Sequence, residues 1–445
     1  MQFAHGLVQR ANLPIPEEMF FGAAAVVLIV SFLALAALWP QPKLEGDHWR
    51  PLPGGLGRLL GAPALETACG AAGVVLLAVV VVAGLAGTEN GLDNFTPTFV
   101  FIIFWVGLAF ASALLGNVFA AFSPWRAIGR ASGWVVRRAR GGRPPRHRPY
   151  PERLGRWPAA AGVLVFTWIE LASGWGEDPR MIALAVLGYT AITLAAQAMF
   201  GVETWTRRGE AFAVYFDLFA RIAPFERRDG VAGVRPPLSG LPRLDVVPGT
   251  VALVLVMIGS VTFDGISVGQ LWDDLTGDAA FEAPVLVATL GLVGGVALVS
   301  SFYVLGVAGA RTVGGDVSAA RLRRAFVHSL VPIALVYVAA HYLTFLVFEG
   351  QGIAYLASDP LGEGWNLFGT AGATIDYGAL SQNQAWYLQV GFVVAGHVAA
   401  LILAHDRALA LYPEAKLAVR SQYWMLAVMV GFTMLALWLL AAAQG

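Results

Sequence analysis

The sequence predicts an all-α, polytopic transmembrane helix bundle of about ten spans, and three observations predict it. Of the 445 residues, 57% are hydrophobic and 13% are charged, whereas a soluble domain carries about 25% charged residues. The apolar residues gather into runs of about 20, the length that crosses a hydrocarbon core. The connections between the runs alternate between basic and acidic. We therefore expect one domain, residues 1–445, embedded as a multi-pass protein in the lipid bilayer of the plasma membrane.

Ten apolar runs define the expected spans. They are 19–39, 66–87, 97–121, 157–174, 180–200, 247–265, 284–309, 326–348, 386–408 and 421–443. A shorter run at 209–223 carries Glu210, Asp217 and Arg221, which favours an amphipathic helix along the membrane surface. The connection at 349–386 exceeds the usual length of a structureless loop. We expect it to fold over the outer end of the bundle.

The charge of the connections predicts the orientation. The connection between the third and fourth spans is rich in arginine and should be cytoplasmic. Counting alternately from it, every basic connection falls inside and every acidic connection falls outside. Ten spans with both termini outside satisfy all the loops, whereas an odd number would not. The arginine run 137–148 sets this topology, and we expect it to touch anionic lipid.

Composition and motifs exclude several classes of function. The net charge is zero and no domain is strongly basic, which argues against a nucleic-acid partner. The single cysteine, Cys69, allows neither an internal disulfide nor a cysteine-rich metal site. The sequence has no phosphate-binding glycine loop, no Gly-x-Ser-x-Gly elbow and no His-Glu-x-x-His helix.

Four of the seven histidines fall in two neighbouring spans, where ionisable side chains are costly and usually paired or functional. His328 and His341 belong to the eighth span, and His397 and His405 belong to the ninth. These spans are antiparallel, so a rise of about 1.5 Å per residue brings His328 towards His405 near the inner surface. The same count puts His341 near the level of His397. The eighth-span pair is separated by about 140° around the helix axis, so both cannot face one partner helix.

Three interpretations of these histidines remain open. In the first they bind a transition metal, copper or zinc, because neutral imidazole is a good ligand for both. The candidate ligands are the four histidines, two carboxylates near the outer surface and one terminal histidine: His341, His397, His328, His405, Glu349, Glu170 and His5. In the second, histidines of facing helices hold a b-type haem. In the third, each histidine only bonds a backbone carbonyl or a nearby tyrosine.

Three polar positions outside this cluster have specific expectations. His5 follows Ala4, the small residue that a signal peptidase requires, so a mature chain beginning there would offer copper an amine and an imidazole. An ordinary terminal histidine is the alternative. We expect Asp264 to end the sixth span as a cap. His405-Asp406-Arg407 is expected to form a cap at the membrane interface with a local ion pair.

Short segments along nearly the whole chain carry a family resemblance. They include Ala4-His5-Gly6, Asp93-Asn-Phe-Thr-Pro-Thr-Phe99, Gly116-Asn117, Ser123-Pro-Trp-Arg126, Thr262-Phe-Asp-Gly265, Ala340-His-Tyr342, Gly364-Trp-Asn-Leu-Phe-Gly369, Gly396-His397 and Ala404-His-Asp-Arg-Ala-Leu409. In these segments the sequence resembles the integral membrane proteins of actinobacteria that are labelled fenitrothion hydrolase. The resemblance implies hydrolysis of an organophosphate triester with release of a phenol. It assigns no catalytic residue.

The leading hypothesis joins this resemblance to the histidines. A metal-bound water would attack the phosphorus of an apolar small-molecule substrate. The substrate would enter from the lipid or through the outer loop, where Trp365 and Phe368 stack on its ring and Tyr342 lies nearby. The alternative is a membrane transporter or metal-handling protein whose histidines, stacked at different depths, form a path across the bilayer. A haem-bearing redox subunit is the third possibility, and the sequence leaves the oligomeric state open.

Overall fold

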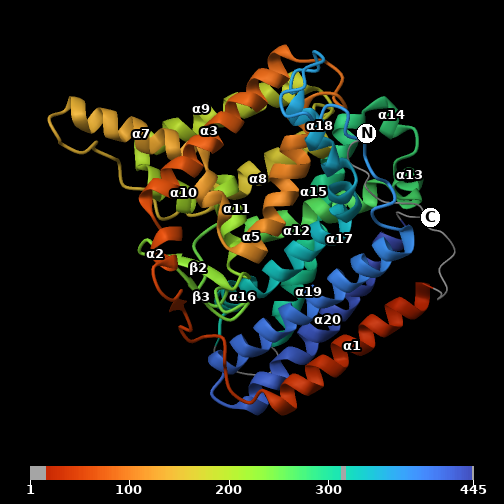
Figure 1. The fold of residues 1–445 in the computed structure, drawn as a ribbon. Helices are drawn as coiled ribbons and strands as arrows, with labels where there is room; N and C mark the ends of the chain where they lie inside the picture. Colours follow the sequence, from red (N-terminus) through yellow and green to blue (C-terminus); the bar gives the residue numbers. More distant parts are fainter. Residues whose placement is uncertain (1–16, 312–316, 443–445) are drawn as a thin grey trace.

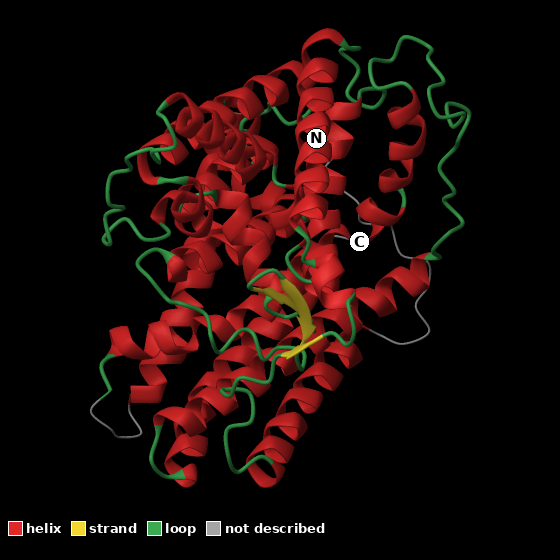
Figure 2. Cartoon of the chain, turned by 60° about the vertical axis from the view of Figure 1, so that its left-hand side comes forward, coloured by secondary structure: helices red, strands yellow, loops and turns green. Residues whose placement is uncertain are grey.

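The computed structural model describes residues 17–311 and 317–442, and these form a bundle of long helices (Figure 1). In this part of the chain, nine helices are long and apolar enough to cross a membrane. Helix dominates the fold, and the strands form one small sheet (Figure 2). The prediction of an all-α polytopic bundle is therefore confirmed. His5 lies outside the described residues.

The nine long spans follow the predicted apolar runs, and three of them join consecutive helical segments. They are α1 (Glu17–Leu38), α2 with α3 (Leu56–Leu60, Pro63–Ala86), α4 with η1 and α5 (Phe95–Pro97, Thr98–Gly107, Leu108–Leu115), α9 (Pro179–Phe200), α12 (Thr250–Ser267), α15 (Pro284–Arg311), α16 with η2 and α17 (Ala319–Phe326, Val327–Ser329, Leu330–Val347), α19 (Gln382–Leu411) and α20 (Ala415–Ala442).

The fourth predicted span, 157–174, is a shorter helix, α8 (Trp157–Leu171). Its 15 residues rise about 22 Å, which is less than the thickness of a hydrocarbon core. The helix ends because Ala172 leaves the helical conformation ahead of Gly174, whose φ is +76°. Glu170 therefore lies in the last turn of α8, at the point where a full-length span would continue.

The helix α11 (Ala211–Ala220) differs from its prediction, because it lies inside the bundle and not along the membrane surface. Nine of its ten residues are buried, and it packs against α5 and α8. The charges of this segment do not line a polar face. Glu210 is the N-cap and accepts hydrogen bonds from the amides of Phe212 and Ala213, while Arg221 is the C-cap and pairs with Asp217. The charged residues mark the ends of an apolar helix, so the surface-helix prediction is wrong.

The third span contains a π-helix, η1, over Thr98–Gly107. Runs of π-helix are rare and often occur at functional sites, because the wider turn shifts the side chains that follow it. Here Phe101 and Trp105 are buried against the centre of the bundle. The span ends at Leu115, before the predicted residue 121, because Gly116 has a φ of +90° and breaks the helix.

A three-stranded antiparallel sheet forms on the predicted cytoplasmic side, with strand order β1 (Arg50–Pro51), β3 (Val231–Val234), β2 (Phe225–Arg228). The turn between β2 and β3 is Asp229-Gly230, and both residues have positive φ. This is the preferred sequence for a two-residue hairpin. Shorter helices also lie between the spans: α6 (Val118–Phe122), α7 (Pro124–Ala139), α10 (Val202–Arg208), α13 (Gln270–Thr276), α14 (Ala279–Glu282), η3 (Glu349–Gly352) and α18 (Ile353–Ser358).

The outer connection that was predicted over 349–386 is partly helical. It begins with η3 and α18, and α19 already starts at Gln382. The loop is fixed to the neighbouring outer connection, because the Thr88 amide donates a hydrogen bond to the Leu361 carbonyl. The Ser358 hydroxyl pairs with the hydroxyl of Thr370 and closes the loop on itself.

Candidate functional site: a carboxylate, histidine and tyrosine cluster

Asp264 is the centre of a buried polar cluster. The prediction that Asp264 ends its helix as a cap is wrong, because α12 continues to Ser267. Asp264 lies within the last turns of α12 and has no exposed surface. The Tyr342 hydroxyl donates a hydrogen bond of 2.6 Å to Asp264 Oδ2. His341 Nε2 lies 2.8 Å from the same oxygen, without the alignment of a hydrogen bond. Two consecutive residues of α17 thus converge on one carboxylate oxygen.

The second carboxylate of the cluster is Glu170, from the last turn of α8. It lies within electrostatic range of Asp264. Glu170 Oε2 and Asp264 Oδ1 are both buried and have no hydrogen-bond partner among the described residues. Buried polar atoms are nearly always paired in folded proteins, and an unpaired one carries a substantial free-energy cost. Two such atoms in one place indicate a site that is completed by a ligand or by water.

Both carboxylates line a cavity of about 200 Å³. Its walls come from α4, η1, α8, α12, α15, α17 and the connection after α8: Pro97, Phe101, Glu170, Leu171, Ala172, Gly174, Gly176, Glu177, Asp264, Ser267, Pro284, Val285, Ala288 and Phe345. The early end of α8 explains the space, because small residues replace the missing turns. Three of the lining residues are acidic and none is basic. The cavity therefore combines an apolar wall with a strongly acidic end.

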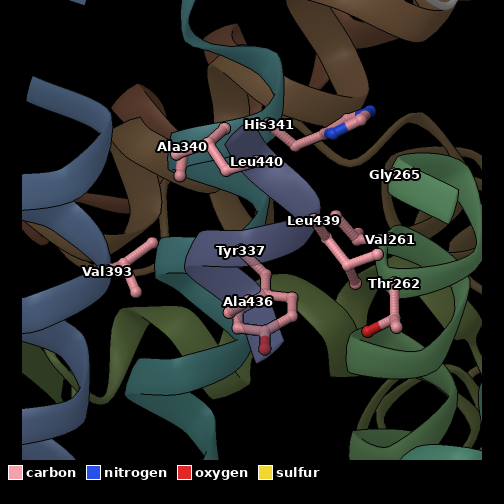
Figure 3. Close-up of a pocket in the computed structure, with 10 residues that line it drawn as sticks. All are labelled: Val261, Thr262, Gly265, Tyr337, Ala340, His341, Val393, Ala436, Leu439 and Leu440. Atoms are coloured by element: carbon pink, nitrogen blue, oxygen red, sulfur yellow. The ribbon is translucent and has the colours of Figure 1, made fainter. Parts of the chain in front are cut away.

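His341 lines a second, smaller cavity of about 40 Å³ (Figure 3). In this view the imidazole extends from α17 towards the α12 segment that carries Gly265. The remaining lining is almost entirely apolar, and much of it comes from α20 through Ala436, Leu439 and Leu440. His341 and Asp264 thus line two cavities of very different polarity.

The predicted metal ligands are not brought together. Among the described residues, no three histidine, cysteine, aspartate or glutamate side chains are placed to hold a metal ion. Glu349 lies in η3, where Tyr377 contacts it at 3.5 Å. Of the predicted ligands, the cluster contains only His341 and Glu170, and Asp264 joins them. These residues do not fit a copper or zinc centre.

The other three histidines of the predicted cluster have separate surroundings. His397 Nδ1 lies 2.7 Å from the Val393 carbonyl of its own helix, and its ring packs beside Tyr337 and Phe432. His328 Nδ1 lies 2.8 Å from the Ala325 carbonyl. These contacts match the interpretation in which a buried histidine bonds a backbone carbonyl. His328 does not pair with His405.

His405 and Asp406 form a second buried polar group, near the helix ends that the loop charges predict to be inner. His405 lies 3.3 Å from the Gln422 side chain and 3.1 Å from the Trp39 carbonyl. Asp406 accepts hydrogen bonds from the Trp39 indole and from the backbone amides of Lys43 and Leu44. The predicted cap with a local ion pair is not formed, because Asp406 lies inside α19 and binds the chain that follows α1, while Arg407 pairs with Glu45. These residues fasten the end of α1 to α19 and α20.

Of the three aromatic residues predicted to bind substrate, two lie away from the cluster. Trp365 and Phe368 are 41% and 72% exposed, and neither lines the two cavities. Tyr342 is buried and bonded to Asp264. The aromatic rings at the acidic cavity are Phe101 and Phe345, which sequence reasoning missed.

An aromatic stack lies on the α8 side of the cluster. Trp105 of η1 stacks on Tyr215 of α11, with ring centroids 4.2 Å apart and planes inclined by 16°. The Tyr215 hydroxyl and the Trp105 indole nitrogen are buried and unpaired among the described residues. Tyr215 is within electrostatic range of Glu170. The buried helix α11, expected on the surface, therefore supplies part of the wall behind the site.

No protein-family model, curated protein or solved structure matches this chain.

Proposed function

We propose that this chain is a membrane-embedded hydrolase of small, neutral esters, with its acid–base site at the outer end of the bundle. The carrying observation is the pair of carboxyl groups, Asp264 and Glu170, whose unpaired oxygens line one cavity. Organophosphate triesters are the substrate class that the resemblance to the fenitrothion hydrolase proteins implies. The site's outward position rests on the loop charges.

In the proposed reaction Asp264 is ionised and Glu170 is protonated when substrate binds. Asp264 Oδ1 accepts a proton from a water molecule while the water oxygen forms a bond to phosphorus. The bond from phosphorus to the aryl oxygen breaks, and Glu170 gives its proton to the leaving oxygen. The products are a phosphate diester and a phenol. The proton held by Asp264 then passes to Glu170, which restores the starting state with one water consumed.

His341 and Tyr342 act as positioning residues in this scheme. Both contact Asp264 Oδ2, which directs the other oxygen into the acidic cavity. A carboxylate held by two neighbours keeps its orientation through the reaction, and fixed orientation lowers the cost of reaching the transition state. Phe101 and Phe345 offer the apolar surface for the aromatic ring of the substrate.

The proposal includes no metal step, because the ligand set does not assemble around one centre. We expect phosphotriester turnover by the purified protein to survive treatment with a chelator. Metal analysis by mass spectrometry tests the same point. A stoichiometric copper or zinc ion that is lost in His341→Ala and His397→Ala would overturn this scheme and support the metal-dependent route.

The test of the function is turnover of a chromogenic phosphotriester in detergent and in vesicles. Asp264→Asn and Glu170→Gln remove the base and the acid with little change in volume, and each should lower kcat by at least about 100-fold. The matched control is Asp273→Asn, in α13 on the outer side of the bundle and outside both cavities. Undiminished turnover in both site variants would reject the proposal.

A second function has its own supporting observation, the acidic lining of the cavity. The cavity is lined by three acidic residues and by no basic residue, beside two phenylalanine rings, and this lining favours a small organic cation. Such a protein would bind or carry a cationic solute. This agrees with the transporter hypothesis, but with the acidic cavity in place of the histidine path. Uptake of radiolabelled choline into vesicles, set against its neutral isostere 3,3-dimethylbutanol, tests this alternative. Uptake without phosphotriester turnover would favour the cation.

A further inference from the structure

The helix α7 (Pro124–Ala139) is anchored to the bundle at one end only. Its first half packs against α3 and α9, where the Trp125 indole donates a hydrogen bond to the Thr190 hydroxyl. Arg126 and Arg130 form ion pairs with Glu66 and Glu203. Figure 1 shows the remainder of α7 extending beyond α3 and α9, clear of the other helices.

The free half of α7 exposes apolar side chains. Trp134, Val135 and Val136 are 61%, 56% and 41% exposed. A methyl group added at Gly133 would meet no atom within 4 Å. Isolated helical turns of this kind have little stability in water, because most helical stability comes from packing an apolar face. This half of the helix therefore needs a surface that the described part of the chain does not provide.

The residues of α7 divide between two faces. Arg126, Arg130 and Arg137, spaced by four and seven residues, share one side, whereas Ile128, Ala131 and Val135 share the other. An arginine face opposite an apolar face is the pattern of a helix that lies in a membrane interface.

Positive charge continues beyond this helix. Arg138 lies over the Trp134 ring, 5.5 Å from its centroid, which keeps a cation beside the apolar face. Six more arginines follow before the next helix: Arg140, Arg143, Arg146, Arg148, Arg153 and Arg156. Within residues 17–311 and 317–442, no acidic side chain pairs with Arg137 or Arg138. Their charge is therefore available to an external anion.

We infer that the free half of α7 lies in the headgroup region on the cytoplasmic side and binds anionic lipid. Trp134 and Val135 enter the boundary with the acyl chains, and Arg137 and Arg138 contact lipid phosphate groups. The anchored half fixes the direction in which the helix leaves the bundle. The ligand is an anionic phospholipid of the bilayer that surrounds the protein. An anionic headgroup is favoured because Arg137 and Arg138 have no acidic partner among the described residues.

Lipid binding tests the charge part of this inference. The full chain is exchanged from phosphatidylcholine into mixed vesicles with phosphatidylglycerol, and bound lipid is counted by native mass spectrometry. Arg137→Gln with Arg138→Gln should weaken phosphatidylglycerol binding by roughly 25-fold, because each basic residue near the surface contributes about a fivefold factor. The matched control, Arg321→Gln with Arg323→Gln, removes the same charge from another cytoplasmic segment and should have a smaller effect. Equal losses in the two pairs would overturn the assignment to α7.

Membrane depth tests the apolar part separately. Cys69 is the single cysteine, so Cys69→Ser gives a background in which Val135→Cys carries one nitroxide label. We expect the label to be reached by oxygen more readily than by a water-soluble nickel complex. Preferential access by the nickel complex would show that α7 projects into water and would overturn the inference. Cys69→Ser with Ser132→Cys, on a neighbouring turn, is the matched reference.

Discussion

Two buried pairs of histidine and aspartate, at opposite ends of the bundle, have opposite hydrogen-bonding states. At the inner end, Asp406 accepts three hydrogen bonds and His405 has a polar partner at each ring nitrogen. At the outer end, Asp264 is just as buried, but one of its oxygens is unpaired. His341 beside it contacts the carboxylate without a well-aligned hydrogen bond.

The difference in hydrogen bonding between the two pairs indicates a structural role for Asp406 and a functional role for Asp264. A fully paired polar group in an apolar interior stabilises one arrangement of the chain and has no capacity left for a ligand. An incompletely paired group costs free energy, and it persists where the free atoms border a cavity that water or substrate enters. The same residue types therefore fasten helices at one end and form the candidate site at the other.

The largest expected effect on stability comes from the inner pair. Asp406→Ala would leave the buried amide of Leu44 and the neighbouring amide of Lys43 without their acceptor, at a cost of about 3 kcal/mol. The variant should unfold at a clearly lower temperature in detergent, while kcat per folded molecule stays near that of the wild type. Differential scanning fluorimetry and turnover on the same sample check both statements. A loss of turnover without a loss of stability would contradict the division of roles.

Asp264→Asn should show the reverse behaviour. The amide still accepts the hydrogen bond from Tyr342, so we expect the unfolding temperature to stay within about 2 °C of the wild type. Turnover of a phosphotriester should fall by at least about 100-fold, because the amide cannot take a proton from water. If this variant unfolds as early as Asp406→Ala, the outer cluster is a structural group like the inner one.

Two tyrosine variants test the same comparison, with smaller expected effects than the aspartate variants. Tyr342 donates its hydrogen bond to Asp264, whereas Tyr303 donates to the backbone carbonyl of Arg323. Tyr342→Phe should lower kcat about tenfold with KM unchanged, because one hydrogen bond to a charged group is lost. Tyr303→Phe should leave kcat unchanged and lower only the unfolding temperature. A change of KM alone in Tyr342→Phe would show that this tyrosine binds substrate and does not position Asp264.

Nine of the ten predicted spans correspond to long apolar helices among the described residues, because hydropathy acts over whole segments. The direction of the spans stays a prediction from the loop charges. The sequence missed Asp264 for a local reason, since Gly265 was taken as the end of a helix that continues to Ser267. It placed α11 on the surface because its charges were read as one face, although they lie at its two ends. Which histidines meet depends on helix rotation and tertiary packing, and residue spacing does not determine either.

The smallest expected effect concerns the acid stability of the α7 anchor, a paired group outside both clusters. Burial alone would raise the pKa of Glu203, but Arg126 and Arg130 outweigh burial and lower that pKa below its ordinary value. A lowered pKa in the folded state means that the ionised carboxylate stabilises the fold fully above the ordinary pKa. This contribution is lost as the pH falls through the folded value. The unfolding temperature of the wild type should therefore fall more between pH 6 and about pH 3 than that of Glu203→Gln. Because Glu203 is half exposed, we expect a difference of only about 1–2 °C, and parallel curves for the two proteins would show that the ion pair adds nothing to the anchor.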